Sequence, residues 1–111
     1  MTVKRIVFRP EAEADLFELY RYIALASGSI EVAFNFTERL RAACFTLVDF
    51  SERGALRNDV KAGLGILIHE RKTIIAYFVK DDSVIINNIF HAGRDWETTL
   101  LHADEPPPPK D

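Results

Sequence analysis

His91 is the side chain in this sequence with the clearest chemical potential, and it ends a run of strand-forming residues three positions before Arg94. An imidazole titrates near neutral pH, so a histidine here could serve as the general acid or base of RNA cleavage. Such a reaction also needs cations to stabilise the charge that develops on the phosphorus, and Arg57, Lys61 and Arg71 are the candidates. The simpler alternative is that His91 hydrogen-bonds to the loop that follows its strand.

The same basic residues have a second interpretation as binding residues. Arg57 or Arg71 could hold a phosphate through two parallel hydrogen bonds, or could pair with acidic residues of a partner protein. Tyr77 lies within a strand-like run, where a tyrosine usually packs against its neighbours and less often stacks on a base. Arg94 either pairs with the aspartate that follows it or faces a partner. The candidate binding residues are Arg57, Lys61, Arg71, Tyr77, His91 and Arg94.

Metal and cofactor chemistry finds little support in the spacing of the ligand-type residues. The three histidines, His69, His91 and His102, form no metal-binding spacing with the single cysteine, Cys44. That cysteine falls near the apolar face of a predicted helix and is interpreted as a core residue. The segment Gly63-Leu64-Gly65 lacks the helix and the lysine of a phosphate-binding loop. The sequence therefore predicts no metal and no cofactor.

The elements that must position these residues follow from the hydrophobic pattern. Pro10 suits the first turn of a helix, Ser27-Gly28 ends the helical repeat that follows, and Ser29 can cap a second helix. Asp95 can cap a short helix near the C-terminus. The expected elements are a strand over 3–8, helices over 10–27 and 29–50, a polar connection over 51–62, strands over 64–70, 73–80 and 83–91, and a helix that ends near residue 101.

This order of elements predicts an α+β fold of the form β-α-α-β-β-β. The helical hairpin should pack on one face of a mainly antiparallel four-stranded sheet, because an apolar sheet face needs a cover. Residues 1–101 should form a single domain. Residues 102–111 contain four consecutive prolines and should form an extended or disordered tail.

Length, composition and charge limit the classes of function. A chain of 111 residues suits one domain, and its 48% hydrophobic content is enough for a core without disulfides. No segment has the length and apolarity of a signal peptide or a membrane span, so a cytoplasmic location is expected. The net charge of −3 argues against direct nucleic-acid binding, which normally requires a basic face.

Several short patterns follow one another along the chain. They are Phe8-Arg9-Pro10-Glu11-Ala12 with Asp15-Leu16, Tyr22-Ile23-Ala24, Ala33 to Leu40, Gly54 with Arg57, Gly63-Leu64, Ile75-Ala76-Tyr77-Phe78-Val79, and Val84 to Ile89 leading to His91-Ala92-Gly93-Arg94-Asp95. In this order and spacing they resemble the ParE/RelE toxin superfamily of plasmid-stabilisation proteins. The resemblance implies the fold predicted above and a cognate antitoxin whose C-terminal segment wraps the toxin. It also implies one of two activities, inhibition of DNA gyrase by ParE-like members or ribosome-dependent cleavage of mRNA by RelE-like members.

Two departures from the superfamily pattern favour its ParE-like branch. Gly65 stands where many relatives have arginine, and Lys61 is the only lysine of a stretch that is lysine-rich in RelE-like members. The interpretation is therefore a non-enzymatic toxin that inhibits DNA gyrase and is neutralised by a ParD-like antitoxin of the ribbon-helix-helix class. An exposed apolar groove should receive an amphipathic helix of that antitoxin. The alternatives are an mRNA endoribonuclease and an inactive relative that retains only antitoxin binding.

Overall fold

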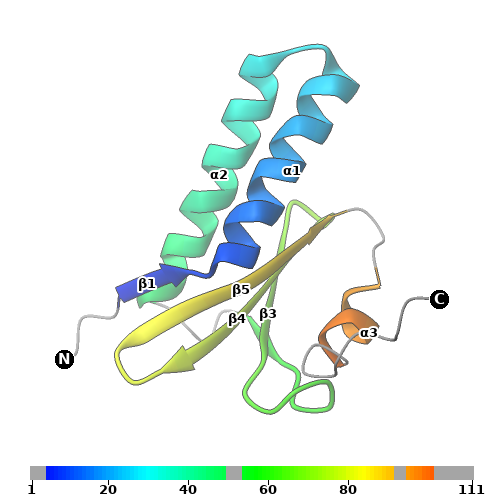
Figure 1. Cartoon of the computed structure of the whole chain (residues 1–111). Helices are drawn as coiled ribbons and strands as arrows, with labels where there is room; N and C mark the ends of the chain where they lie inside the picture. Colours follow the sequence, from blue (N-terminus) through cyan, green and yellow to red (C-terminus); the bar gives the residue numbers. More distant parts are fainter. Residues whose placement is uncertain (1–4, 50–53, 92–94, 102–111) are drawn as a thin grey trace.

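The chain forms a helical hairpin over one face of a mixed sheet, with a short third helix on the other face (Figure 1). The computed structural model describes residues 5–49, 54–91 and 95–101. The tail predicted over 102–111 lies outside the described residues. The elements are β1 (Arg5–Phe8), α1 (Pro10–Ser27), α2 (Ile30–Asp49), β2 (Ala55–Leu56), β3 (Gly65–His69), β4 (Thr73–Lys80), β5 (Ser83–His91) and α3 (Trp96–Leu101).

The ends of the hairpin helices are set by local chemistry that the sequence revealed. Pro10 occupies the first turn of α1, where a missing N–H leaves no bond unmade. Gly28 ends the helix in the left-handed conformation, with φ of 71°, and its N–H donates to the carbonyl of Ala24 at 2.9 Å. Ser29 caps α2, because its hydroxyl oxygen accepts the N–H of Val32 at 3.1 Å. The predicted positions of both helices are confirmed.

The sheet has five strands in the order β1-β5-β4-β3-β2, so the predicted count of four was wrong. The added strand is β2, whose residues Ala55 and Leu56 pair antiparallel with Ile66 and Gly65 of β3. Two residues are too few to show an alternating pattern, and the segment that contains them was predicted as a polar connection. β1 pairs parallel with β5, and the other pairs are antiparallel. The α+β class and the hairpin-on-sheet arrangement are confirmed.

The main core lies between the helical hairpin and one face of the sheet. The strands alternate, so one set of side chains in β4 and β5 points toward the helices. Burial of these apolar side chains against the hairpin is the main stabilising contribution to the fold. Fully or nearly fully buried members are Ala12, Leu16 and Leu19 of α1, Leu40, Cys44 and Leu47 of α2, and Ile75, Tyr77, Val84, Ile86 and Ile89 of the sheet.

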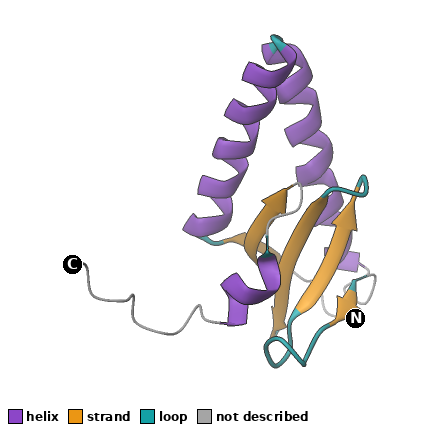
Figure 2. Ribbon diagram, turned by 90° about the vertical axis from the view of Figure 1, so that its right-hand side faces the viewer, coloured by secondary structure: helices purple, strands orange, loops and turns teal. Residues whose placement is uncertain are grey.

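A smaller core lies on the opposite face of the sheet, beneath α3. Leu100 of α3 is 1% exposed and packs with Ile66, Ala76 and Phe90 of the strands. Trp96 packs at the margin of this cluster. Thus α3 covers only part of this face, as Figure 2 shows. The uncovered part carries the groove described in the next section.

A bulge in β5 changes the direction of its side chains. Ala76 pairs with Asn88 while Tyr77 pairs with Ile86, so Asn87 is an extra residue in the strand. As a result Ile86 and Ile89, three positions apart, both face the main core. The N–H of Ile89 donates to a carboxylate oxygen of Asp15 in α1 at 2.8 Å, which ties the helix to the bulge.

The far half of the hairpin extends beyond the strands (Figures 1 and 2). Large apolar side chains near its tip are exposed, including Leu25 at 81% and Ile30 at 70%. Phe34 and Phe45 of α2 are also more than half exposed, although their neighbours Ala33 and Cys44 are buried. Neither helix is long and apolar enough to cross a membrane, a finding that holds for the described residues.

A cationic groove on the open face of the sheet

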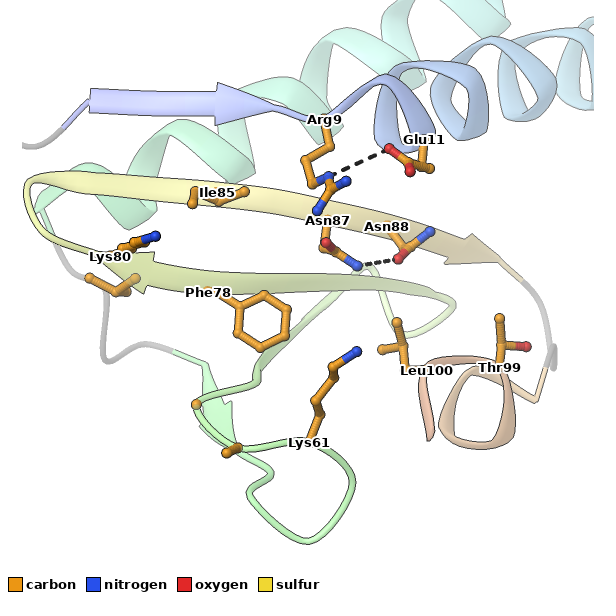
Figure 3. A pocket seen from close by; sticks show the side chains of 13 residues that line it. Arg9, Glu11, Lys61, Phe78, Lys80, Ile85, Asn87, Asn88, Thr99 and Leu100 are labelled. Atoms are coloured by element: carbon orange, nitrogen blue, oxygen red, sulfur yellow. Dashed lines mark hydrogen bonds and ion pairs between the residues drawn. The ribbon is translucent and has the colours of Figure 1, made fainter. Parts of the chain in front are cut away.

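The open face of the sheet carries a groove of about 720 Å³ between β5, β4 and α3 (Figure 3). Its apolar surface includes Phe78 of β4, Ile85 of β5 and Leu100 of α3. Figure 3 shows Lys61, from the loop before β3, pointing between Phe78 and Leu100. A concave surface of this volume and mixed lining is typical of a binding site.

The bulge in β5 supplies the polar part of the groove. Asn87 and Asn88 are consecutive, yet both line the groove, because the extra residue interrupts the alternation of the strand. Their side chains are joined by a hydrogen bond of 2.5 Å, donated by Nδ2 of Asn87 to Oδ1 of Asn88. The two amides place both donors and acceptors beside the apolar surface.

The charged side chains of the groove are mostly basic. Arg9, Lys61 and Lys80 line it, and Glu11 is the acidic residue among the lining side chains of the described chain. Arg9 and Glu11 form an ion pair with 3.5 Å between Nε and Oε1, which partly neutralises that corner. The groove therefore attracts negative charge although the chain as a whole carries a net charge of −3.

Arg57 lies next to the groove but is held by contacts within the protein. Its guanidinium donates to both carboxylate oxygens of Asp59, at 2.9 and 2.8 Å, and to Glu97 of α3 at 2.7 Å. It also lies over the ring of Trp96, 5.2 Å from the centroid. These hydrogen bonds, first that to Asp59 and then that to Glu97, raise the pKa of Arg57. Its donors are thus directed at internal acids.

Tyr77 points into the main core and is 3% exposed. A Cβ atom added to Gly65 would lie 2.4 Å from Cζ of Tyr77, and one added to Gly54 would lie 2.4 Å from its Oη. The two glycines therefore make room for the ring. The position of Tyr77 is that of a packing residue and leaves no face of the ring for stacking on a base.

His91 lies at the far end of β5, on the face covered by the helices. Its Nδ1 is 2.9 Å from the hydroxyl of Thr73, which pairs with it across the β4–β5 ladder. The rings of Tyr22 and Phe36 each lie 5.9 Å from the imidazole, measured between centroids. Burial, and secondarily the charge of Lys72, lower the pKa of His91 below its usual value. The neutral form of His91 is therefore favoured, and the ring is partly enclosed by the two aromatic side chains.

A second histidine, His69 of β3, pairs with Thr73 from the side opposite to His91, so the three residues lie side by side across β3, β4 and β5. Its Nε2 is 3.0 Å from a carboxylate oxygen of Glu70, which itself pairs with Arg39 of α2. This nitrogen atom is buried, and it has no hydrogen-bond partner among the described residues. These contacts attach the β3–β4 turn to the hairpin.

Arg71 lies in that turn, with a positive φ of 69° and an exposed side chain. It thus shares the His91 end of the sheet, whereas Arg57 and Lys61 precede β3 at the opposite end. Arg94 falls outside the described residues. No group of three histidine, cysteine, aspartate or glutamate side chains that could hold a metal occurs in the described part of the chain.

Comparison with known proteins assigns the chain to a family. The family model described as the ParE toxin of the type II toxin–antitoxin system parDE matches residues 6–96. The chain belongs to the ParE toxin family. Among solved structures, a chain of the chromosomal ParDE toxin–antitoxin system from P. aeruginosa matches with a TM-score of 0.72. It is 22% identical, and the match covers 81% of this chain and 97% of that one. A search of curated proteins finds no match.

The family match gives this ParE chain its biological class, a toxin of a type II toxin–antitoxin system. The match ends at Trp96, so Thr99 and Leu100, which form the α3 side of the groove, lie beyond it.

Sequence reasoning missed most of the groove, including Arg9, Phe78, Lys80, Asn87 and Asn88. The sequence did contain a signal for the bulge. Val84 and Ile86 are two positions apart, as in a regular strand, but Ile86 and Ile89 are three positions apart.

Proposed function

We propose that this toxin acts by binding DNA gyrase, without hydrolytic chemistry of its own, and that a ParD-like antitoxin neutralises it. The observation that carries the first part is the separation of the residues that an RNA-cleaving site would need. Lys61 lies before the first residue of β3 and Arg71 lies after its last residue. The five residues of the strand span about 14 Å. A general acid–base residue and its cations must surround the same phosphate within hydrogen-bond reach. A toxin that traps an enzyme by occupying its surface has no such requirement.

The state of the individual side chains supports the same proposal. The guanidinium of Arg57 is engaged by two carboxylates, and Tyr77 is buried. His91 lies under the aromatic rings of Tyr22 and Phe36, which limits its access to a large RNA substrate. Exposed apolar side chains on the hairpin, by contrast, offer contact surface to a protein target.

The proposal is tested by DNA supercoiling with purified gyrase and purified toxin. We expect loss of supercoiling activity and, after denaturation of the enzyme, linear plasmid from trapped cleavage complexes. The double variant His91→Ala, Arg71→Ala is the matched control, and it should inhibit as well as the natural protein. Intact gyrase activity together with cleaved transcripts in expressing cells would establish the ribonuclease alternative. Intact gyrase, intact transcripts and normal growth would identify an inactive relative.

The groove on the open face is the site that we assign to the antitoxin. Its apolar surface suits a hydrophobic anchor residue, and Lys61 and Lys80 suit acidic residues on either side of that anchor. Asn87 and Asn88 can bond to the backbone of a bound segment. The occupant that fits is therefore an acidic, amphipathic segment.

The binding partner is sought as the product of the adjacent gene, co-expressed and purified with this chain. We expect a stable complex in which backbone amides of β5 between Ile85 and Asn88 gain protection from hydrogen exchange. A complex that protects only the hairpin helices would place the antitoxin elsewhere and contradict this assignment.

A further inference from the structure

Helix α3 is too short to be stable without support from the rest of the protein. It has six residues, far fewer than an isolated helix needs in water. Its start is capped by Asp95, whose carboxylate accepts the N–H of Thr98 at 3.2 Å. Leu100 is its buried anchor. Thr99 and Leu100 form one side of the groove, so the shape of the groove depends on the position and the orientation of α3.

Arg57 makes the contacts that can fix this helix. Its Nη2 atom donates to Glu97 of α3 at 2.7 Å, and its guanidinium lies over the ring of Trp96 in the first turn. The same guanidinium donates twice to Asp59 in its own loop. Charge-assisted hydrogen bonds of this kind are directional and hold both partners in one geometry.

The backbone of Arg57 also organises the loop that carries Lys61. Its N–H donates to the carbonyl of Leu64 at 2.7 Å, which closes the loop where β3 begins. Its carbonyl accepts the N–H groups of Val60 at 3.1 Å and of Lys61 at 3.3 Å. Both the Lys61 side and the α3 side of the groove therefore depend on one residue that does not line the groove itself.

We infer that Arg57 is a positioning residue, a clip that joins α3 to the 57–64 loop and so sets the width of the groove between them. This inference rests on the proposed function in one respect only, that the groove receives the antitoxin. It replaces the interpretation of Arg57 as a target-binding residue. The clip predicts that loss of the Arg57 or the Glu97 side chain releases α3 from the 57–64 loop. The core beneath the hairpin should stay intact, because it lies on the other face of the sheet.

The first test measures α3 directly in the full-length protein. Trp96 is the only tryptophan of the chain, so its fluorescence reports on the first turn of α3. The variant Glu97→Gln removes the charge on the α3 partner and keeps the bonds between Arg57 and Asp59. We expect a red shift of Trp96 emission, and an increase of about tenfold in hydrogen exchange at the amides of Thr99 and Leu100. Arg57→Ala should give a larger effect, and Arg57→Lys an intermediate one.

Controls separate the clip from a general loss of stability. Arg21→Ala removes an exposed ion pair with Glu18 on α1 and should leave Trp96 unchanged. Amides of α1 and α2 should exchange at natural rates in the Glu97→Gln variant. If α3 exchange and Trp96 emission stay at natural values in both Glu97→Gln and Arg57→Ala, the clip does not exist.

The second test measures affinity for the adjacent gene's product. Glu97→Gln should weaken binding by about tenfold, and the effects of Arg57→Ala and Glu97→Gln should not add, because both remove the same contact. Additive losses would contradict the clip. Release of α3 with unchanged affinity would leave the clip standing and overturn the groove as the antitoxin site. The two proposals can therefore fail separately.

Discussion

Gly65 of β3 faces Tyr77 of β4 across the sheet, and the tyrosine ring fills the space that a side chain at position 65 would occupy. The two residues pair directly in the β3–β4 ladder, and Gly65 is itself buried. Position 65 is thus used here for packing. A side chain larger than glycine at position 65 would meet this aromatic ring.

Replacing Gly65 by alanine should destabilise the protein by about 1–3 kcal/mol, the usual cost of overpacking. The added Cβ would lie 2.4 Å from Cζ of Tyr77, so the ring or the strand must move. The free energy of unfolding in urea measures the loss. In a Tyr77→Leu background the same replacement should cost little, and an equal cost in both backgrounds would contradict this explanation.

His91 should make stability fall as the pH is lowered. Because burial and Lys72 lower the pKa of His91 in the folded state, the unfolded chain binds this proton more readily. The penalty is absent above the unfolded pKa of about 6.5, grows as the pH falls from there toward the lower folded pKa, and is constant below it, where both states carry the proton. Chemical denaturation at a series of pH values, with His91→Gln as comparison, should show a weaker pH dependence in the variant.

Nuclear magnetic resonance gives a separate check on the cause of that shift. Lys72→Gln should raise the pKa of His91, because it removes one of the two causes and leaves burial unchanged. A titration of the His91 ring proton with the same midpoint in both proteins would remove Lys72 from the explanation.

Cys44 should be unreactive until the protein unfolds. The thiol is fully buried, and burial raises its pKa to about 12, with a smaller opposing effect from the charge of Arg41. Because the thiolate is the reactive form, a disulfide reagent at about pH 8 should not label the native protein. Full labelling should appear in guanidinium chloride. Rapid labelling under native conditions would show that the hairpin opens from the sheet.

The charge of the groove can be tested by reversal at one lysine. Lys80→Glu should lower the affinity for the adjacent gene's product by about two- to fivefold, mainly by slowing association. Lys72→Glu makes the same change in net charge at the opposite end of β4 and serves as the control. Equal effects of the two replacements, measured by surface plasmon resonance at low salt, would mean that only net charge matters.

Most of the fold was predictable because its signals are local. The proline at the start of α1, Gly28 at its end, Ser29 before α2 and Asp95 before α3 each act through bonds within a few residues. The strands over 73–80 and 83–91 were predicted at their observed limits. The two residues of β2 were not predicted, since their pairing depends on β3 rather than on their own pattern.

The site was less predictable because it depends on which residues meet in space. Sequence determined that Arg57, Lys61, Arg71 and His91 have the chemistry to bind or to act on a phosphate. Only the tertiary structure decided that β3 separates Arg57 and Lys61 from Arg71 and His91. It also decided that Arg57 is engaged by acids of the 57–64 loop and of α3. Charge and hydrogen-bonding capacity belong to a side chain and can be read from its type. The partners that use them are set by strand pairing and helix packing, which join residues far apart in the chain.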